Sequence, residues 1–146
     1  MQKKAKLRKE EKQFVVEGIK MVSEAPTDRL VKVYISETFK ADNEEFLERM
    51  NYDSIGKDVL EIVTDNVFMR MADTQTPQGI MAVVRMSDTD LEGILSDKRN
   101  PLLLIIENLQ DPGNLGTIVR MAEGAGVTGI IMSSNTVDIY LSLIHI

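Results

Sequence analysis

A polar segment that follows an apolar run holds the residues of this chain best suited to chemistry. Glu107, Asn114 and Arg120 come after residues 102–106, which are all Leu or Ile. An arginine stays charged in proteins and can stabilise negative charge that develops on a nearby oxygen. Two plainer roles stay open from the residues alone: Asn114 caps a helix, and Arg120 pairs with Glu123 on the helix surface.

Periodicity and turn chemistry predict the elements that position these side chains. Residues 102–106 show no polar alternation, which favours a strand covered on both faces, as in a parallel sheet. Residues 111–113 form an Asp-Pro-Gly turn sequence, and Asn114 is a good N-cap for a helix that starts directly after it. Arg120 then lies off the packed stripe of the helix, and residues 129–132 form the next strand. The pattern predicts a β-α-β unit with its polar residues beyond the carboxyl ends of the strands.

A phosphate-binding glycine loop is a second interpretation of the same segment. Gly113 and Gly116 are separated by two residues, but the first half of the G-x-G-x-x-G pattern is missing. No Lys-Ser or Lys-Thr pair follows either. The spacing therefore argues against a nucleotide-binding oxidoreductase half-domain.

Three segments together resemble the SpoU/TrmH class of SPOUT RNA 2'-O-methyltransferases. Residues 114–120, Asn-Leu-Gly-Thr-Ile-Val-Arg, carry the first motif of that class, preceded by residues 111–113 and followed by Ala-Gly-Val at 125–127. Residues 14–18 resemble the opening of the family's N-terminal substrate-binding domain, and residues 73–80 resemble its end. The matches occur in the family's order and cover nearly the whole chain.

The resemblance implies roles for individual residues. Arg120 would be the catalytic residue, with Asn114 supporting the motif by capping the helix or by orienting Arg120 or RNA. Glu107 and Gly116 are further candidates for support. Beside a ribose 2'-hydroxyl, an arginine favours negative charge on the oxygen, whereas its guanidinium cannot lose a proton and so does not suit a general base. The cofactor implied is S-adenosylmethionine.

The resemblance also implies that the N-terminal domain delivers an RNA substrate, with ribosomal RNA favoured and transfer RNA as an alternative. The whole chain has a formal net charge of −6, yet residues 1–12 hold six basic and two acidic side chains. Such a basic arm can place phosphate contacts locally. The residues expected to bind RNA, in this arm and in a polar turn, are Lys3, Lys4, Lys6, Arg8, Lys9, Thr74, Gln75, Thr76 and Gln78.

From the residues alone, both features expected to bind RNA also have purely structural interpretations. The basic arm is also what a solvated helix end looks like, and the polar turn can be a connection whose groups satisfy one another. A non-catalytic RNA-binding adaptor is the alternative function for the chain as a whole. Only the arginine on the Asn-Leu-Gly motif speaks against it, because an adaptor does not require that residue.

Composition narrows the class of protein. The chain has 146 residues, 43% of them hydrophobic and 27% charged, as in ordinary globular proteins. It has no cysteine and one histidine, which excludes disulfides and argues against a zinc site, so no metal is expected. No run approaches the roughly 20 apolar residues of a membrane span. A cytoplasmic protein without membrane contact is the expectation.

Alternation of strand and helix patterns predicts an α/β protein of two domains. A small α/β/α substrate-binding domain is expected at 1–97, and the first β-α-β part of a Rossmann-like, normally knotted SPOUT domain at 98–146. The linker is expected in the polar residues 87–100. In the first domain, the patterns predict strands at 14–16, 30–35, 59–63 and 79–84 and helices at 17–23, 42–50 and 65–71, the last capped by Asp65.

The family holds its methyl donor in two later motifs, within a region that forms a trefoil knot. This sequence stops before those motifs, and residues 141–146 do not fit the family pattern. They resemble the conceptual translation of a sequencing adapter and are expected to be non-native. We therefore expect a fragment without the S-adenosylmethionine site, of an enzyme that is a homodimer when whole.

Overall fold

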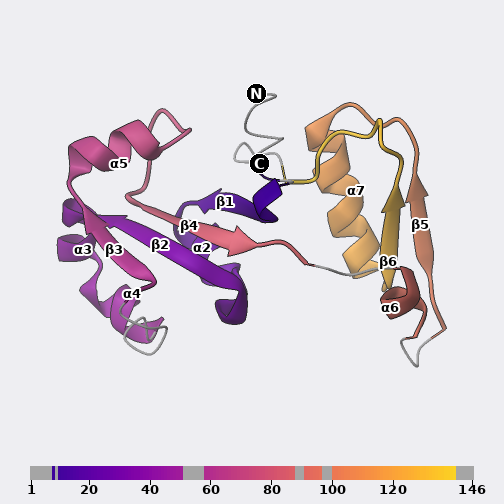
Figure 1. Ribbon diagram of the computed structural model, residues 1–146, viewed down its shortest axis with the longest axis horizontal. Coiled ribbons are helices and arrows are strands. Elements are labelled where there is room, and N and C mark those ends of the chain that lie inside the picture. The colour runs from indigo at the N-terminus through magenta and orange to yellow at the C-terminus, as the bar shows by residue number, and fades with distance from the viewer. Residues whose placement is uncertain (1–7, 9, 51–57, 88–90, 97–99, 141–146) are drawn as a thin grey trace. The chain divides into compact units, whose positions relative to one another are not determined.

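The chain folds into two compact units, Met1–Met86 and Ser87–Ile146 (Figure 1), in a computed structural model that describes residues 8, 10–50, 58–87, 91–96 and 100–140. The division falls upstream of the boundary expected near residue 97. Helix α6 (Leu91–Leu95), expected in the linker, belongs to the second unit. Its Ile94 side chain lies so close to Gly129 that a Cβ built there would meet it at 2.7 Å.

The first unit is built on a mixed four-stranded sheet in the order β1-β4-β2-β3. Strand β4 is antiparallel to β1 and β2, while β2 and β3 are parallel. The carboxyl ends of β1, β2 and β3 therefore meet the start of β4 at one end of the sheet. The strands are β1 (Gln13–Glu17), β2 (Leu30–Ser36), β3 (Leu60–Val63) and β4 (Ile80–Arg85), so all four expected strands are found.

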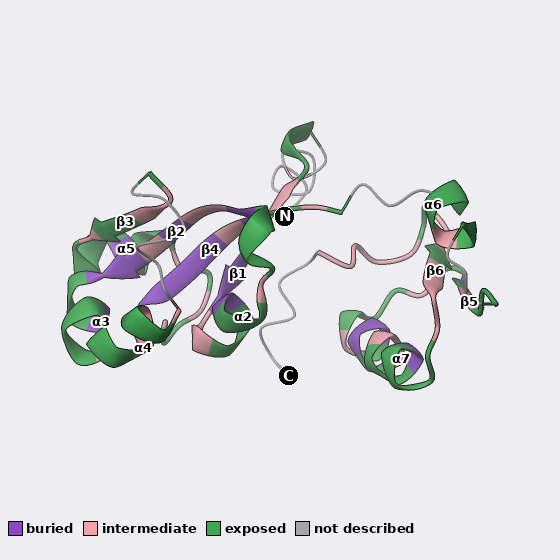
Figure 2. Ribbon diagram, turned by 90° about the horizontal axis from the view of Figure 1, so that it is seen from below, coloured by how far each residue is buried: buried purple, intermediate pink, exposed green. Residues whose placement is uncertain are grey.

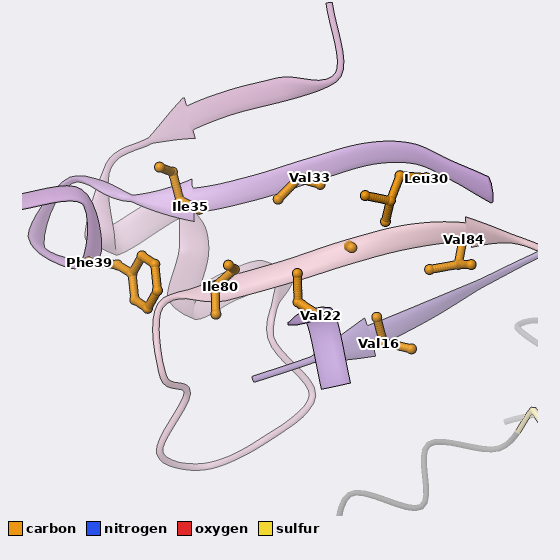
Figure 3. Packing of buried hydrophobic residues seen from close by; sticks show 9 residues of the cluster. Val16, Val22, Leu30, Val33, Ile35, Phe39, Ile80 and Val84 are labelled. Carbon is orange, nitrogen blue, oxygen red and sulfur yellow. The ribbon is translucent and has the colours of Figure 1, made fainter. Parts of the chain in front are cut away.

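The hydrophobic core of this unit lies on one face of the sheet. Three helices run along that face in Figure 2: α2 (Ile19–Glu24), α3 (Glu37–Asp42) and α4 (Glu44–Arg49). A short 3-10 turn, η1 (Thr27–Arg29), leads into β2. Burying one such Val, Leu, Ile or Phe side chain stabilises the fold by about 1.5–3 kcal/mol. The core residues, all but Ala82 labelled in Figure 3, are Val16, Val22, Leu30, Val33, Ile35, Phe39, Ile80, Ala82 and Val84.

The helix expected at 42–50 is found as α4, but α3, which precedes it, was not expected. The two helices are separated at Asn43, whose φ of −130° and ψ of 33° are not helical. Ser36 starts α3 by accepting the Phe39 N–H at 3.1 Å, and the Asn43 side chain donates to the Phe39 carbonyl at 3.0 Å. Phe39 and Phe46, one from each helix, meet edge to face with ring centres 6.1 Å apart. Tertiary packing of these rings favours the break over one longer helix.

Helix α5 (Asp65–Met71) is capped by Thr64 and not by Asp65, the expected cap. The Thr64 hydroxyl accepts the Val67 N–H at 3.4 Å. The Asp65 carboxylate reaches across to α3 and accepts the Thr38 hydroxyl at 2.8 Å and the Thr38 N–H at 3.4 Å. The hydrogen bond from the Thr38 side chain, followed by one from Ser36, lowers the pKa of Asp65 below its ordinary value of 3.8. This carboxylate joins the first turns of two helices.

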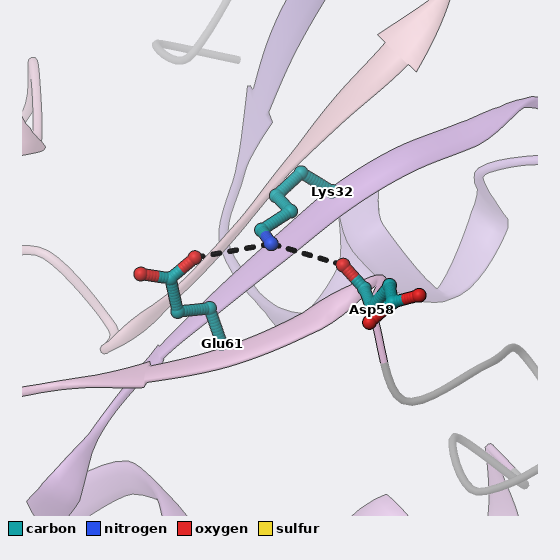
Figure 4. A network of polar contacts seen from close by, with 3 residues as sticks. All are labelled: Lys32, Asp58 and Glu61. Carbon is teal, nitrogen blue, oxygen red and sulfur yellow. Dashed lines mark hydrogen bonds and ion pairs between the residues drawn. The ribbon is translucent and has the colours of Figure 1, made fainter.

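The exposed strand β3 is tied to β2 by a lysine. Lys32 Nζ donates to the Asp58 carbonyl at 2.9 Å and forms an ion pair with Glu61 at 3.1 Å (Figure 4). Both side chains of the ion pair are partly exposed. Such a pair is worth at most about 1 kcal/mol, so it aligns the edge strand more than it stabilises the sheet.

The second unit contains the expected parallel β-α-β arrangement. Strand β5 (Leu103–Ile106) pairs in parallel with β6 (Gly129–Met132), and helix α7 (Pro112–Gly124) connects them. The expectation that β5 is covered on both faces is wrong for the described residues. Ile105 is 72% exposed and its register partner Ile131 is 38% exposed, so one face of this two-stranded sheet is bare.

None of the helices in the described parts of the chain has the length and apolar character needed to cross a lipid bilayer. Within the same parts, no three His, Asp or Glu side chains come together as metal ligands would.

Substitution of Gly79 is expected to destabilise the first unit strongly. Its φ is +84°, and an added Cβ would meet Phe39 Cβ at 2.8 Å and Ser36 Oγ at 2.9 Å. We expect Gly79→Ala to lower the free energy of opening of the β4 amides by more than about 2 kcal/mol, measured by native-state hydrogen exchange. The matched variant is Gly126→Ala, where φ is +76° but nothing lies within 4 Å. It should cost its own unit only about 1–2 kcal/mol, and equal losses at the two sites would mean that the Phe39 contact gives way easily.

Acid is expected to weaken the junction of α3 and α5. Because the folded pKa of Asp65 is lowered, its contribution is present above the unfolded pKa and is lost as pH falls through the folded pKa. Asp65→Asn should therefore narrow the difference in stability between neutral pH and pH of about 3, as followed by thermal unfolding. Thr38→Val, which removes the main donor, should narrow it in the same way. An unchanged pH profile in both variants would contradict this assignment.

Candidate functional site

Helix α7 begins earlier than expected, and a different residue caps it. Asp111 is the N-cap, and its carboxylate accepts the Asn114 N–H at 2.6 Å, while Pro112 occupies the first helical position. Proline suits that position because its missing N–H has no partner there in any case. The expected cap, Asn114, thus lies inside the first turn. Its side chain is exposed and has no hydrogen-bond partner among the described residues.

Arg120 is presented to solvent by the same helix. Leu115, Gly116 and Ala122 are buried on the packed side of α7, whereas Arg120 is exposed, as its helical phase predicts. Within the described chain its guanidinium forms no ion pair, so the local pairing with Glu123 is not formed. A cation held on a rigid helix without a protein partner can interact with an oxygen of a ligand.

Asn114 and Arg120 are not brought into contact. They are six positions apart in the helix, which corresponds to about 9 Å along the axis and about 120° around it. Gly116, another expected support, is buried between them in the helix. Glu107 directly follows β5 and is exposed, with no hydrogen bond of its side chain to any described residue. The expected site residues therefore lie at the end of β5 and at separate turns of α7, and they do not form a bonded cluster.

Two loops beyond the carboxyl ends of β5 and β6 are clasped together, a feature that the sequence reasoning missed. The Gln110 amide donates to the Asn135 carbonyl at 2.6 Å, and the Asn108 N–H donates to Ser133 Oγ at 3.0 Å. The Val137 N–H reaches the Leu109 carbonyl at 2.8 Å. Asn108 has a positive φ of 53°, which asparagine tolerates better than most residues. The loop that leads into α7 is thereby held by the loop that follows β6.

We call the bonded loops 107–111 and 133–137 the clasp. The clasp does not by itself offer a suitable binding site for S-adenosylmethionine. The Gln110 side-chain amide and the Asn135 carbonyl bond to each other, and Ser133 and Thr136 share a hydrogen bond at 3.0 Å. Groups already paired in this way are not free to hold an adenine or an amino-acid moiety. The clasp is a support for the motif helix.

In the first unit, the polar turn between α5 and β4 is partly used by the fold. The Thr74 hydroxyl and the Asp73 N–H both donate to the carboxylate of Glu17, a residue that the sequence reasoning did not single out. The Gln78 amide oxygen accepts the Ile19 N–H at 2.8 Å. Two of the four turn residues expected to bind RNA, Thr74 and Gln78, are therefore engaged internally.

The remaining candidates divide between the turn and the basic arm. Gln75 and Thr76 are exposed, and their side chains have no hydrogen-bond partner in the described chain. Arg8 lies in a helical turn and is half-buried. The other basic residues of the arm lie outside the described residues; they are Lys3, Lys4, Lys6 and Lys9.

Comparison with known proteins agrees with both units. Residues 1–82 match the family described as the MRM3-like substrate-binding domain. The human mitochondrial protein named rRNA methyltransferase 3 is 31% identical over 140 residues, which cover 90% of this chain and 31% of that protein. RlmB of Haemophilus influenzae, named a 23S rRNA (guanosine-2'-O-)-methyltransferase, is 35% identical over 77 residues, covering 50% of this chain and 31% of that protein.

A solved structure extends the likeness to three dimensions. The rRNA methyltransferase of Sinorhizobium meliloti, determined with AdoMet bound, superposes with a TM-score of 0.69 and 26% identity. The match covers 93% of this chain and 49% of that one. The chain thus spans about a third of the curated relatives and about half of the solved structure. By the match over residues 1–82, this chain belongs to the family described as the MRM3-like substrate-binding domain, and the curated relatives and solved structures that resemble it are named RNA methyltransferases.

Proposed function

We propose that this chain is part of an enzyme that methylates a ribose 2'-hydroxyl of RNA, with 23S ribosomal RNA as the substrate. The observation that carries the proposal is Arg120: it occupies the arginine position of the family motif, on a rigid helix, exposed and without an ion-pair partner among the described residues. The names of the human and Haemophilus influenzae relatives support ribosomal RNA, and the second also supports the 2'-hydroxyl. A transfer RNA substrate is the alternative within the same chemistry.

The role of Arg120 follows from electrostatics. As the 2'-hydroxyl loses its proton, negative charge develops on its oxygen, and a fixed guanidinium beside that oxygen lowers the energy of this state. A guanidinium cannot itself accept the proton. Because Asp111 already caps the helix, the exposed amide of Asn114 is left for RNA or for orienting a group of the substrate. Glu107 has the same freedom at the end of β5.

S-adenosylmethionine is the proposed cofactor, and it would supply a methyl group activated by its positively charged sulfur. The relative from Sinorhizobium meliloti was determined with this molecule. The paired groups of the clasp do not suit it, so we propose that it is held by parts of the enzyme other than those described. A homodimer acting in the cytoplasm completes the proposal for the whole enzyme.

Replacing Arg120 is expected to separate chemistry from binding. In the whole enzyme, Arg120→Ala should slow methyl transfer to RNA by at least about 100-fold, because one preorganised group that stabilises an oxyanion contributes that much or more. RNA affinity should stay within about twofold of wild type. Transfer of labelled methyl groups and equilibrium binding measure the two quantities. Glu123→Ala, on the same exposed helix, serves as the control, and turnover of Arg120→Ala within about tenfold of wild type would refute the assignment.

Neutralising the basic arm is expected to weaken RNA binding through its salt dependence. For each phosphate that the arm no longer neutralises, the slope of log K against log salt should flatten by roughly 0.7 with single-stranded RNA. Exchange of Lys40 and Arg49, which are exposed on α3 and α4, for Gln is the control. An unchanged salt slope would show that the arm makes no phosphate contact. The test variant replaces five residues with Gln: Lys3, Lys4, Lys6, Arg8 and Lys9.

A further inference from the structure

Glu17 is a buried acidic residue whose partners all lie in one exposed loop. It ends β1 and is only 7% exposed, and it is the only charged residue buried among those described. One carboxylate oxygen accepts the Asp73 N–H at 3.2 Å, and the other accepts the Thr74 hydroxyl. Burying a carboxylate is costly unless hydrogen bonds compensate. Glu17 therefore ties the first half of the loop 73–79 to the end of β1.

The second half of the same loop is tied to the residues that follow Glu17. The Gln78 side chain accepts the Ile19 N–H at 2.8 Å, next to Gly18. Gly18 has a φ of +95°, and an added Cβ would meet the Gln78 amide oxygen at 2.8 Å. Backbone bonds complete the junction, since Gly18 N–H donates to the Ile80 carbonyl at 2.9 Å. Three consecutive residues, 17–19, thus hold the loop at both of its ends.

This arrangement separates the polar residues of the loop into two groups. Thr74 is half-buried and Gln78 is exposed, and each uses a side-chain oxygen within the fold: the Thr74 hydroxyl donates to Glu17, and the Gln78 amide oxygen accepts the Ile19 N–H. Gln75 and Thr76, at the centre of the loop, are exposed and keep all of their donors and acceptors. Amides and hydroxyls are the groups that read base edges and 2'-hydroxyls of unpaired RNA. A loop that is already fixed loses less conformational freedom when it binds.

We propose that the buried carboxylate of Glu17 is a positioning residue for RNA recognition, which with Gln78 fixes the loop 73–79 so that Gln75 and Thr76 contact unpaired RNA. The inference rests on the proposed function, because it takes RNA as the ligand. It assigns direct contact to two of the four expected turn residues and an internal role to the other two. Glu17 itself does not touch the RNA.

The test compares RNA binding by the whole chain and its variants. The probe is a fluorescently labelled hairpin RNA with an unpaired loop, and the fully paired duplex of the same stem is the reference. Glu17→Gln places an amide group opposite two donors and should weaken hairpin binding by about tenfold, as the loss of a few ordering hydrogen bonds does. Gly18→Ala should do the same by displacing Gln78. Hydrogen exchange at the Asp73 amide should become faster in Glu17→Gln.

Val84→Ala is the control variant that lowers the stability of the first unit without changing the loop. Val84 is buried in the core at the opposite end of β4 from the loop. At a matched or greater loss of thermal stability, this variant should bind the hairpin as wild type does. A double-mutant cycle gives the sharper result: Gln75→Ala with Thr76→Ala should weaken wild type by about tenfold but add little in the Glu17→Gln background, because the contacts are already misplaced.

The outcomes separate the inference from the proposed function. If the wild-type chain binds the hairpin and Glu17→Gln binds it equally well, the inference is overturned but the proposed function is not. Fully additive losses of affinity in the double-mutant cycle would have the same meaning, since Glu17 would then act only through stability. Failure of the wild-type chain to bind the hairpin in preference to the duplex would count against the RNA-reading role of the first unit, and the inference would fall with it.

Discussion

The fit of β4 between β1 and β2 is the constraint on which the rest of the first unit depends. This strand comes from the end of the unit's sequence, yet it takes a central place and buries Ile80, Ala82 and Val84 in the core. The chain has little space where it enters β4, because Gly79 lies against Phe39 and Ser36 and leaves no room for a side chain. The loop before Gly79 must therefore end at one point, directly beside the ends of β1 and β2. That geometry places Glu17 and Gln78 where they bond across the junction and hold the loop proposed to contact RNA.

The second unit depends on a different kind of constraint. Its two strands are parallel, so the loops after β5 and β6 leave the sheet at the same end and can bond to each other. Helix α7 begins directly after this clasped loop, at the Asp111 cap, and carries Arg120 on its exposed side. The bare face around Ile105 and Ile131 shows that the described residues bury only one side of the sheet. In the proposed function, recognition and chemistry fall to separate units, each with its own way of holding a loop.

Much of the fold follows from local sequence patterns, and the errors have a common origin. All four strands of the first unit and the parallel pair of the second lie where apolar runs predict them. The choice of helix caps was less successful, because Thr64 and Asp65 are adjacent and both able to cap, as are Asp111 and Asn114 within one turn. Cap propensities of these residues differ by only a few tenths of a kcal/mol. Contacts from elsewhere, such as that between Asp65 and Thr38, decide between them.

Local sequence was enough to predict the family, the order of the two units and the exposure of Arg120. These follow from motif residues at set spacings and from helical periodicity, both of which are local properties. Which polar residues remain free to bind was decided by tertiary packing alone. Glu17 lies 57 residues from Thr74, and Ile19 lies 59 residues from Gln78. No local pattern encodes such pairs, because they form only when packing of the sheet brings the end of β1 to the start of β4.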